Sequence, residues 1–183
     1  MGKLHLTLIG NPVLRKAANE VDREELQEHE FKKLVKEMVH AMHEWEGVGL
    51  AANQAGIGMQ LCVLECKKNP RYPKVEGFPL EIWINPKIMD YSQDQEEDWE
   101  GCLSIPGYQG LVPRSKTVTI EALNTDGEKV RKTISGFHAR VIQHEVDHLN
   151  GLVYMDRMLD LKQWIHLKEF NKLFHEHQKD REA

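Results

Sequence analysis

Apolar side chains in the first quarter of the chain recur at the spacing of an α-helix. The periodic positions are Phe31, Leu34, Val35, Met38 and Met42. Residues three or four positions apart lie on one face of a helix, so this stripe predicts an N-terminal helix with one buried face. Asp22 with Glu25 resembles a capping box, so we expect the helix to follow Asp22 and to end near Gly47. The methionines of the stripe are more typical of a core than of a cofactor site.

Four later segments show the alternation of apolar and polar residues that is typical of β-strands. They lie around residues 60 to 66, 80 to 91, 116 to 122 and 128 to 134. The last two are joined by Asn124-Thr125-Asp126-Gly127, a turn sequence that predicts a β-hairpin. Together with the helices, these strands indicate an α+β fold.

A further helix is predicted over residues 136 to 150, and its two sides differ in chemistry. With about 100° between successive residues, the apolar side collects Ala139, Ile142, Val146 and Leu149. This side can anchor the helix in a core. The other side presents two histidines and two carboxylates, which are His144, Glu145, Asp147 and His148. Ser135 is the expected N-cap, and Asn150-Gly151 is the expected C-terminal stop.

The spacing of His144 and His148 indicates a metal site, because two imidazoles four positions apart on a helix can bind one ion. A catalytic zinc-like centre takes three protein ligands and leaves one position for water. Cys102 lies in a segment that predicts a turn or strand edge and is the best third candidate, although a lone cysteine is more often a buried hydrophobe. Cys62 and Cys66 are about 13 Å apart on a predicted strand and cannot share an ion. A solvated surface helix is the alternative.

Small residues between positions 47 and 56 form a third notable segment, with the sequence Gly-Val-Gly-Leu-Ala-Ala-Asn-Gln-Ala-Gly. They allow a backbone to approach a ligand closely, but they lack the spacing of a dinucleotide fingerprint. Gln54 is of interest because an amide N–H can stabilise a developing oxyanion whatever the pH. A flexible connection between a helix and a strand explains the segment equally well.

The three segments together resemble one family, peptide deformylase, whose signatures are G-x-G-L-A-A-x-Q, E-G-C-L-S and H-E-x-D-H. All three stand in order at residues 47–54, 100–104 and 144–148. Residues 9–15 are similar to the family's opening, so the resemblance extends to about residue 158. It implies that Cys102, His144 and His148 bind the metal.

The resemblance also implies roles for the residues around the metal. Glu145 is the expected catalytic carboxylate. Gln54 and the Leu103 amide are expected to hold the formyl oxygen, and the backbone at Val48 and Gly49 is expected to contact the peptide. The implied reaction removes the N-terminal formyl group from formylmethionyl nascent polypeptides and releases formate. The family favours one iron(II) ion per chain in the cell, with zinc, nickel or cobalt as substitutes.

An apolar slot for the methionine side chain is expected beside the metal. On the predicted helix, Phe137 and Val141 precede His144 on the same side, at about 20° and 60° from it. Periodicity alone explains them equally well as core residues. Arg140 stands where the better-known bacterial pattern has an apolar pocket residue, so we place it in the pocket with its effect on specificity open. Asp147 is better suited to orienting the site than to catalysis.

The formal net charge of −5 gives the chain no general attraction to nucleic acid or membranes. No stretch is long enough to span a membrane, and three cysteines without a signal peptide favour the cytoplasm. The 183 residues, 40% of them hydrophobic, predict a single compact catalytic domain over residues 1–183. We expect antiparallel or mixed sheets around a central metal-binding helix, with further helices at both ends.

The C-terminal segment from Leu159 to Lys179 has the pattern of an amphipathic helix, which we expect to pack on the domain. In the family this region can help to bring the enzyme to the ribosome near the peptide exit, although here it is only weakly basic. We expect His166, His175 and His177 to be exposed rather than to bind metal.

Two other functions share parts of this pattern. A zinc endopeptidase has the same His-Glu-x-x-His motif, but it usually takes its third ligand from a histidine or a carboxylate rather than from a residue such as Cys102. A non-enzymatic metal-binding module has no evident need for Glu145 and Gln54. Hydrolysis of a formylated dipeptide, without cleavage of internal peptide bonds, distinguishes the deformylase from both.

Overall fold

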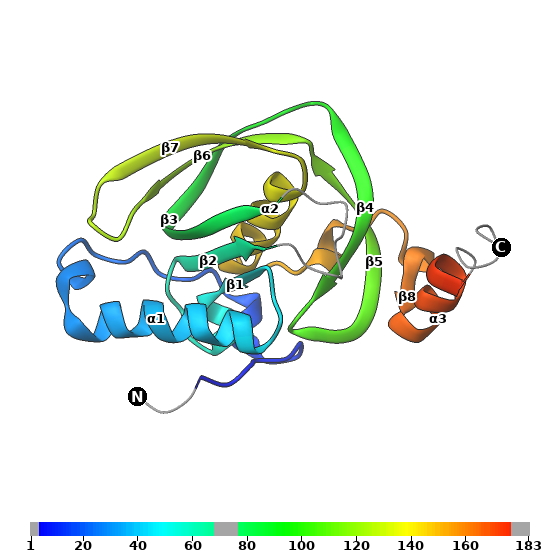
Figure 1. Ribbon diagram of the computed structural model, residues 1–183, viewed down its shortest axis with the longest axis horizontal. Helices are drawn as coiled ribbons and strands as arrows, with labels where there is room; N and C mark the ends of the chain where they lie inside the picture. Colours follow the sequence, from blue (N-terminus) through cyan, green and yellow to red (C-terminus); the bar gives the residue numbers. More distant parts are fainter. Residues whose placement is uncertain (1–3, 68–76, 177–183) are drawn as a thin grey trace.

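The structure consists of two antiparallel β-sheets and three α-helices (Figure 1). The computed structural model describes residues 4–67 and 77–176 of the chain. The larger sheet has the order β1 (Gly49–Ala51), β2 (Leu61–Cys66), β3 (Phe78–Tyr91), β6 (Thr117–Leu123) and β7 (Lys129–Ser135). The smaller sheet has the order β4 (Gln95–Cys102), β5 (Ile105–Ser115) and β8 (Trp164–His166). The α+β prediction is therefore confirmed.

Helix α2 (Gly136–Leu149) runs through the centre of the molecule, where it packs against strands of both sheets (Figure 1). Its predicted apolar stripe, Ala139, Ile142, Val146 and Leu149, lies in a core with residues of β2 and β6. Polar side chains on its other faces are buried as well, so the alternative of a solvated surface helix is wrong.

The ends of α2 agree with the predicted range, but one of the two predicted signals does not act as expected. Gly151, with φ of +78°, forms the left-handed stop after the helix. Ser135 occupies the N-cap position, yet its side chain makes no capping hydrogen bond. The hairpin strand β7 ends at the same residue, so the backbone at Ser135 is already fixed by its pairing with Thr117.

Helix α1 (His29–Glu44) buries the predicted N-terminal stripe in a second core beneath β1 and β2. Its predicted start after Asp22 is wrong. Residues Glu25–Gln27 form a 3₁₀ turn instead, and Glu28 is extended, with ψ of 141°. This break turns Leu26 into the core, where it is 1% exposed. Burial of one leucine therefore outweighs a continuous helix.

The four predicted strands are present as β2, β3, β6 and β7, each within about two residues of its expected limits, and Asn124–Gly127 joins the last two. Strands β4 and β5 were not predicted. Residues 95–98 of β4 are all polar and exposed, so the segment has no alternation to detect. Pairing with β5 along nearly its whole length makes it a strand.

The prediction of a single C-terminal helix is wrong for residues 159–176, the part of the segment that the structure describes. Residues 161–163 form a 3₁₀ turn, β8 follows, and then come α3 (Leu167–Asn171) and a π-helical turn (Lys172–Glu176). The aromatic and β-branched residues of β8 pair with the edge of β5 instead of continuing a helix. His166 is exposed as expected, whereas the side chains of His175 and His177 lie outside the described residues. Within the described residues, no helix is long and apolar enough to cross a membrane.

Candidate metal centre

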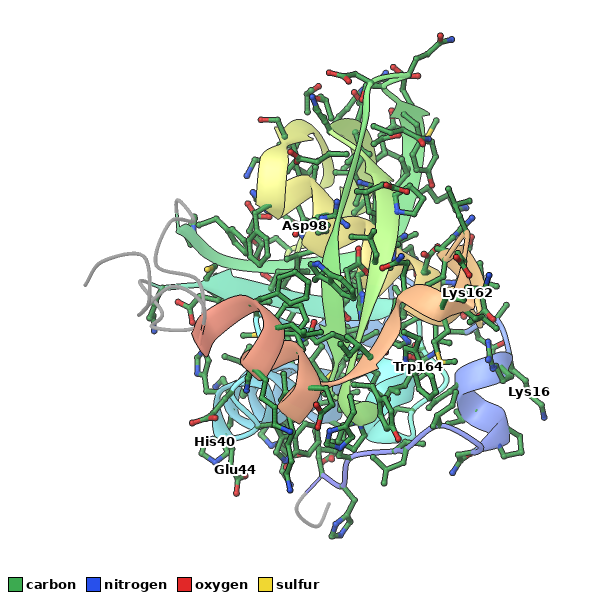
Figure 2. All side chains as sticks on the ribbon, turned by 90° about the vertical axis from the view of Figure 1, so that its right-hand side faces the viewer. Lys16, His40, Glu44, Asp98, Lys162 and Trp164 are labelled. Carbon is green, nitrogen blue, oxygen red and sulfur yellow. The ribbon has the colours of Figure 1, made fainter. Side chains whose placement is uncertain are left out.

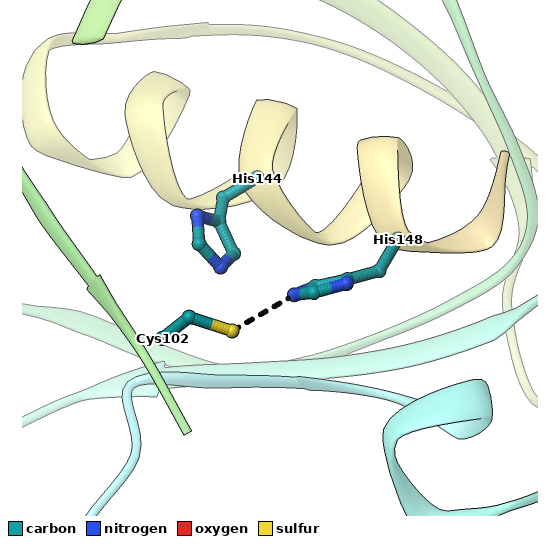
Figure 3. A group of neighbouring side chains, drawn as sticks. All are labelled: Cys102, His144 and His148. Carbon is teal, nitrogen blue, oxygen red and sulfur yellow. Dashed lines mark hydrogen bonds between the residues drawn. The ribbon is translucent and has the colours of Figure 1, made fainter. Parts of the chain in front are cut away.

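Three potential ligands from two elements converge between the sheets. Cys102 ends β4, and His144 and His148 project from one face of α2 (Figure 3). Their ligand atoms all lie within 4.8 Å of one another, and Cys102 Sγ lies 3.2 Å from His148 Nε2. The structure thus brings Cys102 to two histidines that follow it by 42 and 46 positions in the sequence. Cys62 and Cys66 lie on β2, outside this group.

The donor set fits a divalent metal ion. One thiolate and two imidazoles suit zinc or iron(II), and all three face one point. Burial, followed by the proximity of His144, lowers the pKa of His148 well below its ordinary value, so this ring is neutral and has a lone pair to donate. Burial also acts to lower the pKa of His144, but hydrogen bonds with Cys102 and Glu100 raise it well above its ordinary value. An ion bound there must therefore displace a proton.

Glu100 orients the first histidine, a role that the sequence analysis missed. Its Oε2 lies 2.9 Å from His144 Nδ1, which turns Nε2 toward the centre. Arg114 and Arg140 hold the same carboxylate, through Nε and Nη1 contacts of 2.9 and 2.8 Å. Although burial alone would raise the pKa of Glu100, the hydrogen bond with His144 and the charge of Arg114 hold it well below its usual range. Its position two residues before Cys102 on one strand could have indicated a shared face.

Asp147 interacts with arginines rather than with the histidines. Its carboxylate accepts hydrogen bonds from Arg114 Nη1 and Arg157, the latter at 2.6 and 3.0 Å. Because Arg114 also binds Glu100, this arginine connects Asp147 to the centre. The acceptor beside the histidine comes from β4, not from α2.

Glu145 is a buried carboxyl group with an unusually high pKa. Burial is the main cause and raises the pKa to about 7. Its Oε2 has no hydrogen-bond partner among the described residues, so one oxygen is free to interact with a bound water or substrate. A Cβ atom added at Gly49 would overlap Glu145 Oε1, so the glycine of β1 leaves the space that this carboxylate occupies. A group with this pKa can accept and return a proton near neutral pH.

The amide of Gln54 has a fixed orientation. Gln54 lies on the 3₁₀ turn Ala52–Ala55, and its Oε1 accepts a hydrogen bond of 2.9 Å from the Ala51 N–H. Its Nε2 therefore points the other way, toward Ser104 Oγ at 3.3 Å and Cys102 Sγ at 3.6 Å. The donor end of the side chain thus faces the metal ligands, next to the backbone at Leu103.

A cavity of about 440 Å³ opens beside these groups. The predicted catalytic and substrate residues that line it are Val48, Gly49, Gln54, Leu103, Phe137, Arg140, Val141 and Glu145. Cys102 and His144 also border the cavity, and the fully buried His148 lies behind them. The Arg140 guanidinium is committed elsewhere, because it donates to Glu100, Val112 O and Glu96 O. Its charge is therefore largely compensated at the cavity wall.

This α+β fold, with a thiolate and two imidazoles beside a buried carboxylate, defines a metallohydrolase. Comparisons with known proteins define it further. The polypeptide deformylase family model matches residues 3–164. Peptide deformylase 1 of Nitrosomonas europaea is 41% identical over 156 residues, which are 85% of this chain and 88% of that protein. Peptide deformylase 2 of Pseudomonas syringae is 40% identical over the same share of this chain and 87% of its own length.

Solved structures agree with the sequence relatives. The class I type b peptide deformylase of Acinetobacter baumannii, bound to Met-Ala-Ser, has a TM-score of 0.83 and 35% identity over 85% of this chain and 98% of its own. The enzyme of Synechococcus elongatus in complex with actinonin has a TM-score of 0.78 and 36% identity, over 92% of this chain and 84% of its own. The chain belongs to the peptide deformylase family. Its activity is removal of the formyl group from N-terminal formylmethionine, which decides against the endopeptidase and the non-enzymatic module.

Proposed function

We propose that Cys102, His144 and His148 bind one divalent metal ion on which the deformylation depends. The convergence of their ligand atoms within 4.8 Å, next to the unpartnered Oε2 of Glu145, carries this proposal. A divalent ion held there supplies a Lewis acid that activates a water molecule near neutral pH. Glu100 keeps the His144 ring in place through its Nδ1.

Three groups of the chain act on the substrate in this proposal. Glu145 accepts a proton from the attacking water and delivers it to the departing amine, as a carboxyl group with a pKa of about 7 can do in sequence. Gln54 Nε2 and the Leu103 N–H donate to the formyl oxygen and stabilise the negative charge that develops on it. The products are formate and a peptide with a free amino terminus.

The substrate is an N-formylmethionyl peptide, bound along the cavity. Phe137 and Val141 of α2 lie on the cavity wall, where they provide an apolar slot for the methionine side chain. Gly49 at the start of β1 and Val48 just before it offer their backbone, and β1 is an edge strand among the described strands of the larger sheet. Arg140 borders the same wall and supports it by fixing Glu100. The bound Met-Ala-Ser of the Acinetobacter baumannii enzyme supports a peptide in this position.

We infer that iron(II), the ion that the family favours, is bound in the cell. Zinc, nickel or cobalt can replace it, because one thiolate and two imidazoles accept all four ions. We also place the enzyme in the cytoplasm and treat residues 1–183 as one catalytic domain. Docking of the C-terminal segment near the ribosomal peptide exit stays a prediction, which co-sedimentation with ribosomes tests.

A metal and activity assay on protein purified without oxygen tests these roles. Cys102→Ser is expected to lose most of its metal, because the soft ligand is gone, whereas Cys66→Ala, a change in the core of β2, is expected to keep it. Glu145→Ala is expected to keep its metal and to lose about 10²-fold or more in turnover of a formyl-methionyl peptide. Full metal occupancy and unchanged turnover in Cys102→Ser would remove Cys102 from the ligand set.

A further inference from the structure

The cavity wall includes a residue that lies after the part of the chain matched by the family model. The family model ends at residue 164, yet Leu167, the first residue of α3, lines the cavity. Trp99, Tyr108 and Gln109 from β4 and β5 also line the cavity. The segment after residue 164 therefore contributes to the wall of the substrate cavity through Leu167.

Strand β8 holds this segment in a fixed position. It pairs antiparallel with β5, with Tyr108 opposite His166 and Gly110 opposite Trp164. The rings of Tyr108 and Trp164 stack with their centroids 4.2 Å apart, and Trp164 Nε1 donates to Tyr154 Oη at 3.0 Å. Seen from the right-hand side of Figure 1, β8 with the labelled Trp164, at the edge of the smaller sheet, and α3 lie toward the viewer (Figure 2). The segment is thus anchored beside the cavity on both backbone and aromatic contacts.

Helix α3 also supports the cavity wall from behind. The ring of Trp99 packs edge-on against the ring of Phe170, with the centroids 5.1 Å apart. The centroid of the Phe174 ring lies 5.5 Å from that of Trp99. The ring centroids of these two phenylalanines lie 4.8 Å apart. Because Trp99 itself lines the cavity, α3 both contributes Leu167 and fixes the position of Trp99. Leu167 and Trp99 together make an apolar surface that is only partly buried in the protein alone.

The part of the substrate that meets this surface follows from the arrangement of the cavity. The metal ligands and Glu145 fix the position of the formyl group, and the methionine slot is formed by side chains of α2. The C-terminal segment packs on β5 of the smaller sheet instead. A peptide whose formyl group and methionine are held at α2 can reach Leu167 only with its following residues.

We propose that Leu167 and Trp99 form a subsite for an apolar side chain at the second or third residue of the formylated peptide. Residues 164–174 then determine part of the enzyme's preference among nascent chains. Transfer of an apolar side chain onto this surface removes both from water, which favours leucine over serine at the contacted position. The inference rests on the deformylase activity and concerns only which peptides are processed fastest.

Steady-state kinetics on three formylated tripeptides, Met-Ser-Ser, Met-Leu-Ser and Met-Ser-Leu, test the subsite in the metal-loaded enzyme. For the unmodified protein, kcat/KM is expected to be about 10-fold higher with leucine at one of the two positions than for the serine peptide. Leu167→Ala is expected to remove most of this advantage, so that kcat/KM for the leucine peptide falls toward that for the serine peptide. The matched control is Leu173→Ala, because Leu173 is 53% exposed in the same segment and does not line the cavity.

A charge variant distinguishes a subsite from a structural role. Leu167→Glu is expected to favour lysine over leucine at the contacted position, a reversal that a merely weakened fold cannot produce. The subsite is overturned if the unmodified protein has no leucine preference, if Leu167→Ala keeps it, or if all peptides slow equally. Failure of the deformylase activity itself is a separate result, because the unmodified protein would then process none of the three peptides.

Discussion

Gly49 and Glu145 illustrate how a single missing side chain creates catalytic space. The carboxylate occupies the position that a Cβ atom on residue 49 would take. Gly49→Ala is therefore expected to push Glu145 out of place and to lower turnover by about 10²-fold, the size of effect that a displaced catalytic group produces. Metal content should stay within error, because the three ligands are untouched. Gly58→Ala is the control, since a Cβ there meets nothing within 4 Å.

Gln54 has two roles that different substitutions can separate. Its Nε2 faces the site, while its Oε1 satisfies the buried N–H of Ala51. Gln54→Leu is expected to lower the rate by about 10²- to 10³-fold through loss of the oxyanion donor. It should also destabilise the fold by about 1 kcal/mol, because the buried Ala51 N–H loses its hydrogen bond with Gln54 Oε1.

Gln54→Glu keeps an acceptor for Ala51 but removes the donor. It is expected to share the rate loss of Gln54→Leu, because a carboxylate cannot donate, and urea unfolding of both variants measures what each change costs in stability. If the two variants have the same activity as the unmodified enzyme, the formyl oxygen is held by other groups. Loss of metal in parallel with activity would instead assign Gln54 to support of the ligands.

At the scale of elements, buried charge connects α2 to the smaller sheet. Arg114 of β5 is 5% exposed and pairs with both Glu100 of β4 and Asp147 of α2. The charges of these two carboxylates raise the pKa of Arg114 despite its burial, so it is always charged. The guanidinium of Arg114 thus links β4 to α2, and through Glu100 it also fixes the His144 ring.

Arg114→Met is expected to lower the free energy of unfolding by about 3 kcal/mol, because the buried carboxylates of Glu100 and Asp147 each lose one cationic partner. Urea denaturation measures this. The matched control is Arg131→Met, which breaks the exposed pair with Glu121 and should cost less than about 1 kcal/mol. Equal effects of the two substitutions would show that the buried network does not stabilise the fold.

The elements also show what periodicity could and could not predict. Helix α2 and the strands around the core were predicted because each has one apolar face whose spacing is local information. Strand β4 was not predicted, because its exposed polar residues show no alternation and only β5 makes them extended. The C-terminal segment shows the opposite case. Its residues have the periodicity of a helix, but part of the segment forms β8, which pairs with the edge of β5.

For the whole molecule, we expect the bound metal ion to determine how long the activity lasts in air. Iron(II) with an open coordination position reacts with oxygen, and the thiolate of Cys102, which is partly exposed, can be oxidised in turn. The iron form is expected to lose activity in air within a time in which the zinc and nickel forms keep theirs. Equal inactivation of all three forms would place the damage in the protein rather than at the ion.

The motifs alone determined the family, the reaction and the residues that meet at the centre, because a His-Glu-x-x-His helix and a Cys-containing turn carry their chemistry in local spacing. Tertiary structure decided the rest. It selected Glu100 rather than Asp147 as the partner of His144, turned Arg140 toward Glu100, and placed Leu167 at the substrate cavity. These contacts join residues 40 or more positions apart, and only the packing of two sheets around α2 brings such residues together.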